Sequence, residues 1–413
     1  MFAFIARQPI LDREKKVFAY ELLFRDGKSN CYPDIARDEA SSKLIAKNYL
    51  TLGLNEISCD KKAFINFQSE TLFSGFPSSL DPDNVVVELV DGVLSHDNLL
   101  DVCKQVKKLG YKLALEDHRL DSRWQDFLPY IDMVKVNTLR SNKDVIAENA
   151  HRFLDENVQL IAEKVDTQET FTFCRDMGFD YFQGYFFTRP ETLQEKNLPT
   201  SKLTLLELMK ISSSASFDIE KVNNVIEFDV GLSYMLLRFI NNPAINKRHQ
   251  ITSLKHALNY MGEMEIKKFI ALLALANLSD DKPLELLHLS LVRAKFCDLI
   301  ANEKGSGNNP PTGFLVGLFS LLDALLDQNM KFLLTQMPLT EEVKIALSGG
   351  QNDLSNYLVL VKAFESGSWL KVIRIAGILE VDQKRLHSLF NEAIVWGNNM
   401  RKSISPHFPI NKA

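Results

Sequence analysis

The chain has 413 residues, of which 46% are hydrophobic and 24% charged, and its formal net charge at neutral pH is −5. This composition excludes an intrinsically disordered chain, and the length favours two domains over a single core. The slight negative charge excludes a global basic field, so we expect no DNA binding.

Cysteine usage and hydropathy predict a cytoplasmic protein. The five cysteines are odd in number and scattered without a CxxC pair, which is typical of a reducing compartment and argues against disulfides and structural zinc. The N-terminus lacks the pattern of a signal peptide. The longest apolar run, residues 269–278, is too short to cross a bilayer, so we expect membrane signals to arrive through a partner.

The first half alternates short apolar runs with amphipathic helical stretches at 38–52, 95–109 and 142–157. Strand and helix in alternation predict a parallel sheet with crossover helices, and about eight strands in this length predict a closed (β/α)8, TIM-like barrel over residues 1–195. The runs are AFIARQP, VFAYELLFR, AFINF, NVVVELVD, KLALED, DMVKVN, LIAEKVD and YFQGYFF.

Each apolar run carries a polar residue, mostly an oxygen donor. A buried strand seldom carries an unpaired carboxylate, because the unpaired charge is costly, so several such strands predict one shared site. Oxygen donors without cysteine or histidine favour Mg²⁺ or Mn²⁺ over Zn²⁺. In chain order the polar residues are Gln8, Glu21, Asn66, Glu88, Glu116 with Asp117, Lys135, Glu163 and Gln183.

After a polar linker at 196–204 the β pattern stops, and residues 205–400 predict an all-α domain with a C-terminal tail at 401–413. Residues 303–312 contain two glycines, but no strand precedes them and no Lys-Ser/Thr follows, so a plain loop is favoured over a phosphate loop. The predicted helices are 203–211, 218–228, 232–240, 253–278, 284–302, 313–326, 340–347, 355–365, 369–379 and 383–398.

The first half resembles EAL domains, the phosphodiesterases of cyclic di-GMP. ELLFR at 21–25 is similar to the EAL signature, and seven further segments match family elements in the same order. These segments are ARQPI (6–10), FINF (64–67), ELVD (88–91), LED (115–117), VKVN (134–137), AEKVDT (162–167) and FQGYFFTRP (182–190).

The resemblance implies a role for each residue that matches the family pattern. Two divalent ions would hold the phosphate and activate a water, with Lys135 orienting that water and Glu163 acting in catalysis as well as in metal binding. Arg25 would contact phosphate, while Gln8 and Gln183 would line the substrate site. The implied metal ligands are Glu21, Asn66, Glu88, Glu116, Asp117 and Glu163.

The same pattern is broken around the implied metals. Glu116-Asp117 stands where the family has Asp-Asp, and His118, Arg119 and two further residues replace its FGTG loop. Shorter or uncharged residues stand at Asp91, Asn137 and Asp166, and a glycine is replaced by Lys164. Because catalytic groups tolerate little displacement, these changes predict weak or absent hydrolysis.

Simpler interpretations remain open for single residues. Lys135 could be an ion-pair partner of Glu88 or Glu163, and Glu21 alone would be a solvated strand residue. His118 and Arg119 could contact nucleotide phosphate or form a solvated loop. The His-Asp pair at 96–97 is better read as a helix start after Ser95 than as a metal motif.

The second half resembles the HDOD domain, on DVGLSYMLLRFINNPAI (229–245) and residues 251–278. That domain is similar to an HD phosphohydrolase bundle without its catalytic residues, and no histidine between 249 and 407 is followed by aspartate. The resemblance implies a regulatory module that binds protein partners, and it leaves a homodimer open.

Three functions remain open at this point. The first is a cyclic di-GMP signalling protein whose diverged barrel binds metal and nucleotide, or a protein partner, with weak or no hydrolysis. The second is an active metal-dependent phosphodiesterase that makes the linear dinucleotide. The third is a barrel that only assembles partners. By resemblance the context is control of motility or biofilm.

Overall fold

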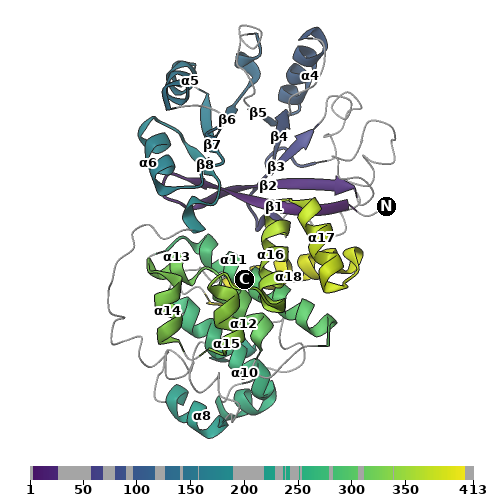
Figure 1. The fold of residues 1–413 in the computed structure, drawn as a ribbon. Coiled ribbons are helices and arrows are strands. Elements are labelled where there is room, and N and C mark those ends of the chain that lie inside the picture. Colours follow the sequence, from purple (N-terminus) through teal and green to yellow (C-terminus); the bar gives the residue numbers. More distant parts are fainter. Residues whose placement is uncertain are drawn as a thin grey trace. The chain divides into compact units, whose positions relative to one another are not determined.

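The computed structural model describes residues 3–26, 57–67, 80–89, 96–116, 126–139, 143–156, 158–188, 218–227, 236–237, 239–241, 251, 254–278, 282–305, 311–337 and 339–404. The chain divides into two compact units, the first containing Met1–Phe187 and the second containing Thr188–Phe364 and Leu370–Ala413. The first unit is mixed α/β and the second is helical (Figure 1). The predicted fold classes are therefore confirmed, and each unit is described by itself.

Eight strands close into a barrel in chain order. Each of the eight apolar runs predicted from the sequence forms one strand. The strands are β1 (Ala3–Asp12), β2 (Val17–Asp26), β3 (Lys62–Phe67), β4 (Val85–Leu89), β5 (Lys112–Glu116), β6 (Met133–Asn137), β7 (Gln159–Glu163) and β8 (Tyr181–Gln183).

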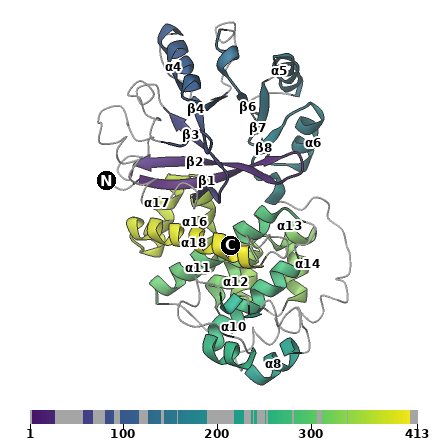
Figure 2. The same ribbon diagram turned by 180° about the vertical axis from the view of Figure 1, so that it is seen from behind.

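The expectation of an all-parallel sheet is wrong for the first strand. β1 runs antiparallel to both neighbours, pairing Gln8 with Glu21 of β2 and Ile10 with Gln183 of β8. The chain reverses between Asp12 and Val17, where the Asp12 carboxylate accepts the backbone N–H groups of residues 14 and 16. A turn this short permits only antiparallel pairing, since a parallel crossover needs a dozen residues or more. The paired β1 and β2 form one long ribbon in Figure 2.

The barrel interior is filled by one fully buried residue from each of β1 to β7, and Tyr181 of β8 packs against the layer. The rings of Phe18 and Tyr181 stack with their centroids 3.9 Å apart. The buried layer is Ile10, Ala19, Phe64, Val86, Ala114, Met133 and Ile161. Such filled layers make the inside of a (β/α)8 barrel a packed core rather than a pore.

The described barrel helices are α4 (His96–Lys108), α5 (Lys143–Asp155) and α6 (Gln168–Asp176). Two of them were predicted, and α6 was not. Its N-cap is Thr167, whose hydroxyl accepts the N–H of Thr170, and its buried Phe171 stacks on Phe186 with ring centroids 4.6 Å apart. The expected helix at 38–52 and the expected cap Ser95 lie outside the described residues.

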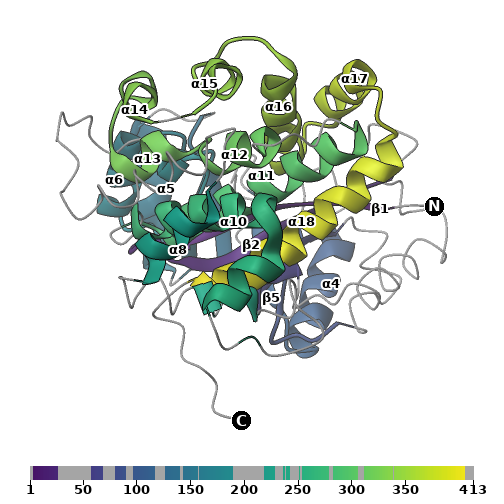
Figure 3. The ribbon, with the colours of Figure 1, turned by 90° about the horizontal axis from the view of Figure 1, so that it is seen from below.

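The regular elements that the structure describes in the second unit are all helices. Its described helices are α8 (Ile219–Glu227), α10 (Leu254–Leu278), α11 (Leu284–Glu303), α12 (Thr312–Leu318), α13 (Leu322–Leu326), α14 (Met330–Gln336), α15 (Glu341–Leu347), α16 (Asp353–Glu365), α17 (Trp369–Leu379) and α18 (Gln383–Ile404). The central α11 is buried on nearly all sides, and α18 lies along it (Figure 3). A Cβ on Gly317 of α12 would overlap the carbonyl oxygen of Arg293 in α11, so this glycine permits close contact between the two helices.

The predicted helix over 313–326 is two helices, because the chain breaks between α12 and α13 around Phe319–Leu321. Helix α14 was not predicted, and the expected helix at 203–211 and the linker lie outside the described residues. Among the helices of the described ranges, none combines the length and hydropathy that a membrane crossing requires.

Candidate functional site

A polar layer lies directly above the buried core layer of the barrel. Side chains two positions apart on a strand point to the same face, so the next inward residue follows the core residue by two. On β2 to β8 that step runs toward the carboxyl end, and on the antiparallel β1 it runs backward. Among the residues whose side chains the structure describes, the step leads from the core layer to Gln8, Glu21, Asn66, Glu88, Lys135, Glu163 and Gln183.

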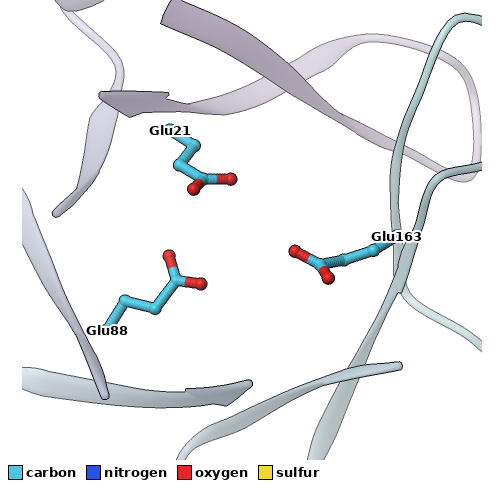
Figure 4. Close-up of side chains that lie close together, drawn as sticks. All are labelled: Glu21, Glu88 and Glu163. Carbon is cyan, nitrogen blue, oxygen red and sulfur yellow. The ribbon is translucent and has the colours of Figure 1, made fainter. Parts of the chain in front are cut away.

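Three carboxylates of this layer point toward one another (Figure 4). Glu21, Glu88 and Glu163 each place an oxygen within 4.8 Å of the others. Their exposed fractions are 6%, 1% and 8%. Three buried carboxylates this close repel one another strongly unless a cation joins them.

The cation that joins them in the structure is Lys135, which is 1% exposed. Its ammonium nitrogen lies 3.0 Å from Glu21 Oε2, 2.6 Å from Glu88 Oε1 and 2.7 Å from Glu163 Oε1. One ammonium thus pairs with three carboxylates. In the metal-free protein Lys135 is therefore an ion-pair partner, as one of the two interpretations from sequence expected. Its partners are both expected residues, Glu88 and Glu163, and also Glu21.

Burial and charge shift the pKa values in opposite directions within the cluster. Burial raises the pKa of Glu88 well above its usual value; Lys135 opposes this, and the charges of Glu21 and Glu163 add to it. Burial also disfavours the charged form of Glu21, but Lys135 and a hydrogen bond from Gln183 bring its pKa below the usual value. For Lys135, burial is outweighed by the three carboxylates, which raise its pKa well above the usual value.

Amide side chains fix the orientation of Glu21. Gln183 donates from Nε2 to Glu21 Oε2, and also to Gln8 Oε1 at 3.0 Å. Asn66 donates from Nδ2 to Glu21 Oε1 at 3.3 Å. Gln8 and Gln183 are both buried at the edge of the carboxylate cluster. Glu21 and the three amide residues line a cavity at the mouth of the barrel together with Glu88 and Glu163.

The residues present fit a divalent cation. Glu88 Oε2 and Gln183 Oε1 are buried and find no hydrogen-bond partner among the described residues, which is costly unless another group occupies the cluster. The donors are hard oxygens, as Mg²⁺ and Mn²⁺ prefer. Three carboxylates against one ammonium leave excess negative charge for an ion to balance. Glu21, Glu88 and Glu163 would hold such an ion, with Asn66 beside them.

Several predicted site residues are placed only in part. Asp91, Asp117, His118 and Arg119 lie outside the described residues. Arg25 and Glu116 lie on β2 and β5, and their backbones alone are described; Glu116 pairs in register with Lys135.

Asn137 and Asp166 depart from the family pattern, and the structure places both. Asn137 ends β6, and its Oδ1 accepts the backbone N–H of Leu139 at 3.1 Å, so this oxygen is engaged locally. Asp166 is partly exposed, two residues before α6 begins.

Thr138 was not among the residues that the sequence predicted at the site. Its hydroxyl lies 2.9 Å from the carbonyl oxygen of Glu163 and 3.1 Å from that of Lys164, and its N–H donates to Glu163 at 3.1 Å. The threonine therefore fixes the backbone at the end of β7. Its position directly after the polar end of a strand was the available signal.

Family comparisons agree with this architecture. An EAL domain model matches residues 50–190, and an HDOD domain model matches residues 198–327. The chain is 33% identical over 404 residues to the cyclic di-GMP phosphodiesterase CdgJ of Vibrio cholerae, covering 97% of this chain and 94% of that protein. It is also 33% identical over 408 residues to the uncharacterized protein YuxH of Bacillus subtilis, covering 97% and 99%.

A solved structure, BlrP1 of Klebsiella pneumoniae with manganese and cyclic di-GMP, is 22% identical. It covers 44% of this chain and 54% of that one with a TM-score of 0.36, which is too low to bear on the site. The curated relatives, by contrast, match along nearly the whole chain. The chain belongs to the family of EAL–HDOD proteins.

Proposed function

We propose that this protein is a cytoplasmic cyclic di-GMP signalling protein whose barrel binds the nucleotide through divalent ions and hydrolyses it weakly or not at all. The observation that carries the proposal is the set of three buried carboxylates within 4.8 Å, with an unpartnered Glu88 oxygen among the described residues. A divalent ion in that cluster would attract the anionic phosphodiester and supply Lewis-acid chemistry.

Slow hydrolysis is proposed from the substitutions beside the cluster. Glu116 extends the usual side chain by a methylene, and His118 and Arg119 replace residues of a glycine-containing loop. Asn137 carries no charge, and its oxygen binds its own backbone. Each change loosens the placement of a metal or water, and catalytic geometry tolerates about half an ångström of error.

The helical HDOD unit would pass the bound state of the barrel to protein partners, which include a second copy of the chain as one candidate. By resemblance we place the output in the control of motility or biofilm. The cysteines that the structure describes are all free and buried, which supports the proposed cytoplasmic location.

A second candidate is an active phosphodiesterase that uses Mg²⁺ or Mn²⁺. Two observations favour it: the carboxylates and Lys135 are assembled in one cluster, and a relative matched over 97% of this chain is named a cyclic di-GMP phosphodiesterase. In this candidate Lys135 would orient the attacking water after releasing its carboxylates to the ions, and Arg25, Gln8 and Gln183 would contact the substrate.

Binding and turnover measured side by side test the proposal. Calorimetry with cyclic di-GMP in Ca²⁺ should show binding that Glu163→Gln removes and that Glu169→Gln, a change at an exposed residue of α6, retains. Turnover with Mg²⁺ or Mn²⁺ should be slow, and Glu116→Asp combined with Asn137→Asp should raise it.

Two results would replace the proposal. Sustained wild-type turnover that Glu21→Ala and Lys135→Ala both abolish would establish the active phosphodiesterase. Absence of nucleotide binding would leave a barrel that only assembles partners.

A further inference from the structure

Lys164, the residue after the β7 carboxylate, has an unusual backbone conformation. Its φ is 57°, in the left-handed region that a side chain with a Cβ disfavours. The EAL pattern has glycine at this position, and the lysine that replaces it here introduces backbone strain that glycine would not have. Backbone strain of this kind is concentrated at functional sites.

The conformation of Lys164 is imposed by its neighbours and not by its own side chain. Thr138 of the β6 end binds the carbonyl oxygens of Glu163 and Lys164. On the other side, the N–H of Val165 donates to Gln183 at 3.0 Å, and the carbonyl of Val165 accepts the N–H of Phe186 at 3.0 Å. The segment is therefore pinned to the strands on both sides, which leaves the lysine side chain available to a ligand.

The side chain of Lys164 belongs to the cavity. Lys164 is exposed and lines the cavity together with Glu21, Glu88 and Glu163. Among the described side chains that line the cavity, that of Lys164 carries the positive charge. Lys135 lies beneath, 1% exposed and bound to all three carboxylates. Within the described ranges, no carboxylate lies at ion-pair distance from Lys164.

We propose that the Lys164 ammonium binds a phosphate oxygen of the dinucleotide from the rim of the site. The proposal rests on the function proposed above, and it concerns affinity rather than the chemical step. A phosphodiester must approach a cluster with excess negative charge, and a lysine on a flexible stem offers a point charge to its phosphate before and during metal contact. A glycine there would relieve the strain but remove this charge.

Glycine substitution at two left-handed lysines isolates the effect. Lys164→Gly should weaken cyclic di-GMP binding in Ca²⁺ about three- to ten-fold, as expected for one exposed charge-assisted contact. Lys15→Gly is the matched control, because Lys15 also has a left-handed φ of 60° but lies in the β1–β2 turn against Phe171 and does not line the cavity. That variant should bind like the wild type.

Two further variants separate charge from backbone. Lys164→Arg should restore affinity to within about two-fold, while Lys164→Asn, which tolerates left-handed φ, should not. The loss in Lys164→Gly should shrink at high salt. Equal affinity of wild type and Lys164→Gly, or full affinity in Lys164→Asn, would overturn this inference alone. No binding by the wild type would overturn the proposed function together with it.

Discussion

Lys135 Nζ and Glu88 Oε1 lie 2.6 Å apart inside the barrel, and each side chain is 1% exposed. A charge buried this deeply is stable only beside charges of the opposite sign, because only their attraction offsets the free-energy cost of removing it from water. The ammonium therefore acts as a tethered cation that holds the carboxylates of three strands together.

Removing that ammonium should destabilise the metal-free protein strongly. Lys135→Met keeps an unbranched side chain one atom shorter but leaves the carboxylates without a cation, and we expect a loss of about 3–5 kcal/mol in the free energy of unfolding. Urea unfolding followed by circular dichroism in EDTA measures this loss. Lys107→Met is the control: its ion pair with Asp132 is partly exposed, and its removal should cost about 1 kcal/mol or less. Equal losses in the two variants would contradict the role given to Lys135.

Glu21→Gln and Glu88→Gln should differ in metal-free stability. Burial raises the pKa of Glu88, so loss of its charge should cost less there, and its replacement should change the free energy of unfolding by about 1 kcal/mol or less. Glu21 has a lowered pKa and is held ionised, so glutamine there should cost about 2–3 kcal/mol.

We expect Mn²⁺ to raise the melting temperature of the wild type, by an amount that grows with the logarithm of the ratio of ion concentration to dissociation constant. Both glutamine variants should lose this stabilisation. Melting curves with EDTA and with Mn²⁺ measure both effects. A wild type that Mn²⁺ does not stabilise would argue against an ion in the cluster.

Gly184→Ala should disrupt the mouth of the barrel. A Cβ at this glycine would overlap the carbonyl oxygen of Val165, so either β8 or the segment after Glu163 must move. We expect a loss of about 1–3 kcal/mol, by analogy with overpacked cores, together with loss of nucleotide binding. Gly377→Ala is the control, since a Cβ on Gly377 of α17 would meet no described residue within 4 Å outside its own helix turn, and alanine should stabilise the helix slightly. Wild-type binding by Gly184→Ala would contradict the contact.

The helical unit should lose stability in mild acid through His387. Burial lowers the pKa of His387 to about 3, and the centroid of its ring lies 4.8 Å from that of the Phe364 ring. Below about pH 6.5 the unfolded chain binds a proton there while the folded chain does not, so the free energy of unfolding falls as the pH falls.

Between pH 7 and pH 5 this single group should cost about 2 kcal/mol. His387→Leu should reduce the pH dependence by that amount, whatever its effect at pH 7, whereas the exposed His256→Leu should not. Urea unfolding at the two pH values measures the difference, and an unchanged slope in His387→Leu would count against it.

Much of the barrel followed from local pattern. Apolar runs predicted the strands, and a polar residue in each run predicted a shared layer, because the two-residue period fixes which side chains face inward. The direction of β1 was not predictable in this way, since a period of two is the same for either direction; the short link from Asp12 to Val17 held that information.

Other features depend on distant contacts. The three ion pairs of Lys135 join strands far apart in the chain, so the sequence left an ion pair and a catalytic role as alternatives. The left-handed φ of Lys164 is set by hydrogen bonds from β6 and β8. The break between α12 and α13 lies within an apolar run, and hydrophobic periodicity gives no sign of it.

Because β1 pairs with β8 as well as β2, the barrel closes between segments at opposite ends of the domain. The hydrogen bond between Gln8 and Gln183 spans 175 positions of the chain. Contacts of such separation form late, after most loop entropy has been lost. During synthesis nearly the whole first domain must therefore leave the ribosome before Gln183 can bind Glu21. A nascent chain that stops short of β8 should carry the carboxylates without the complete site.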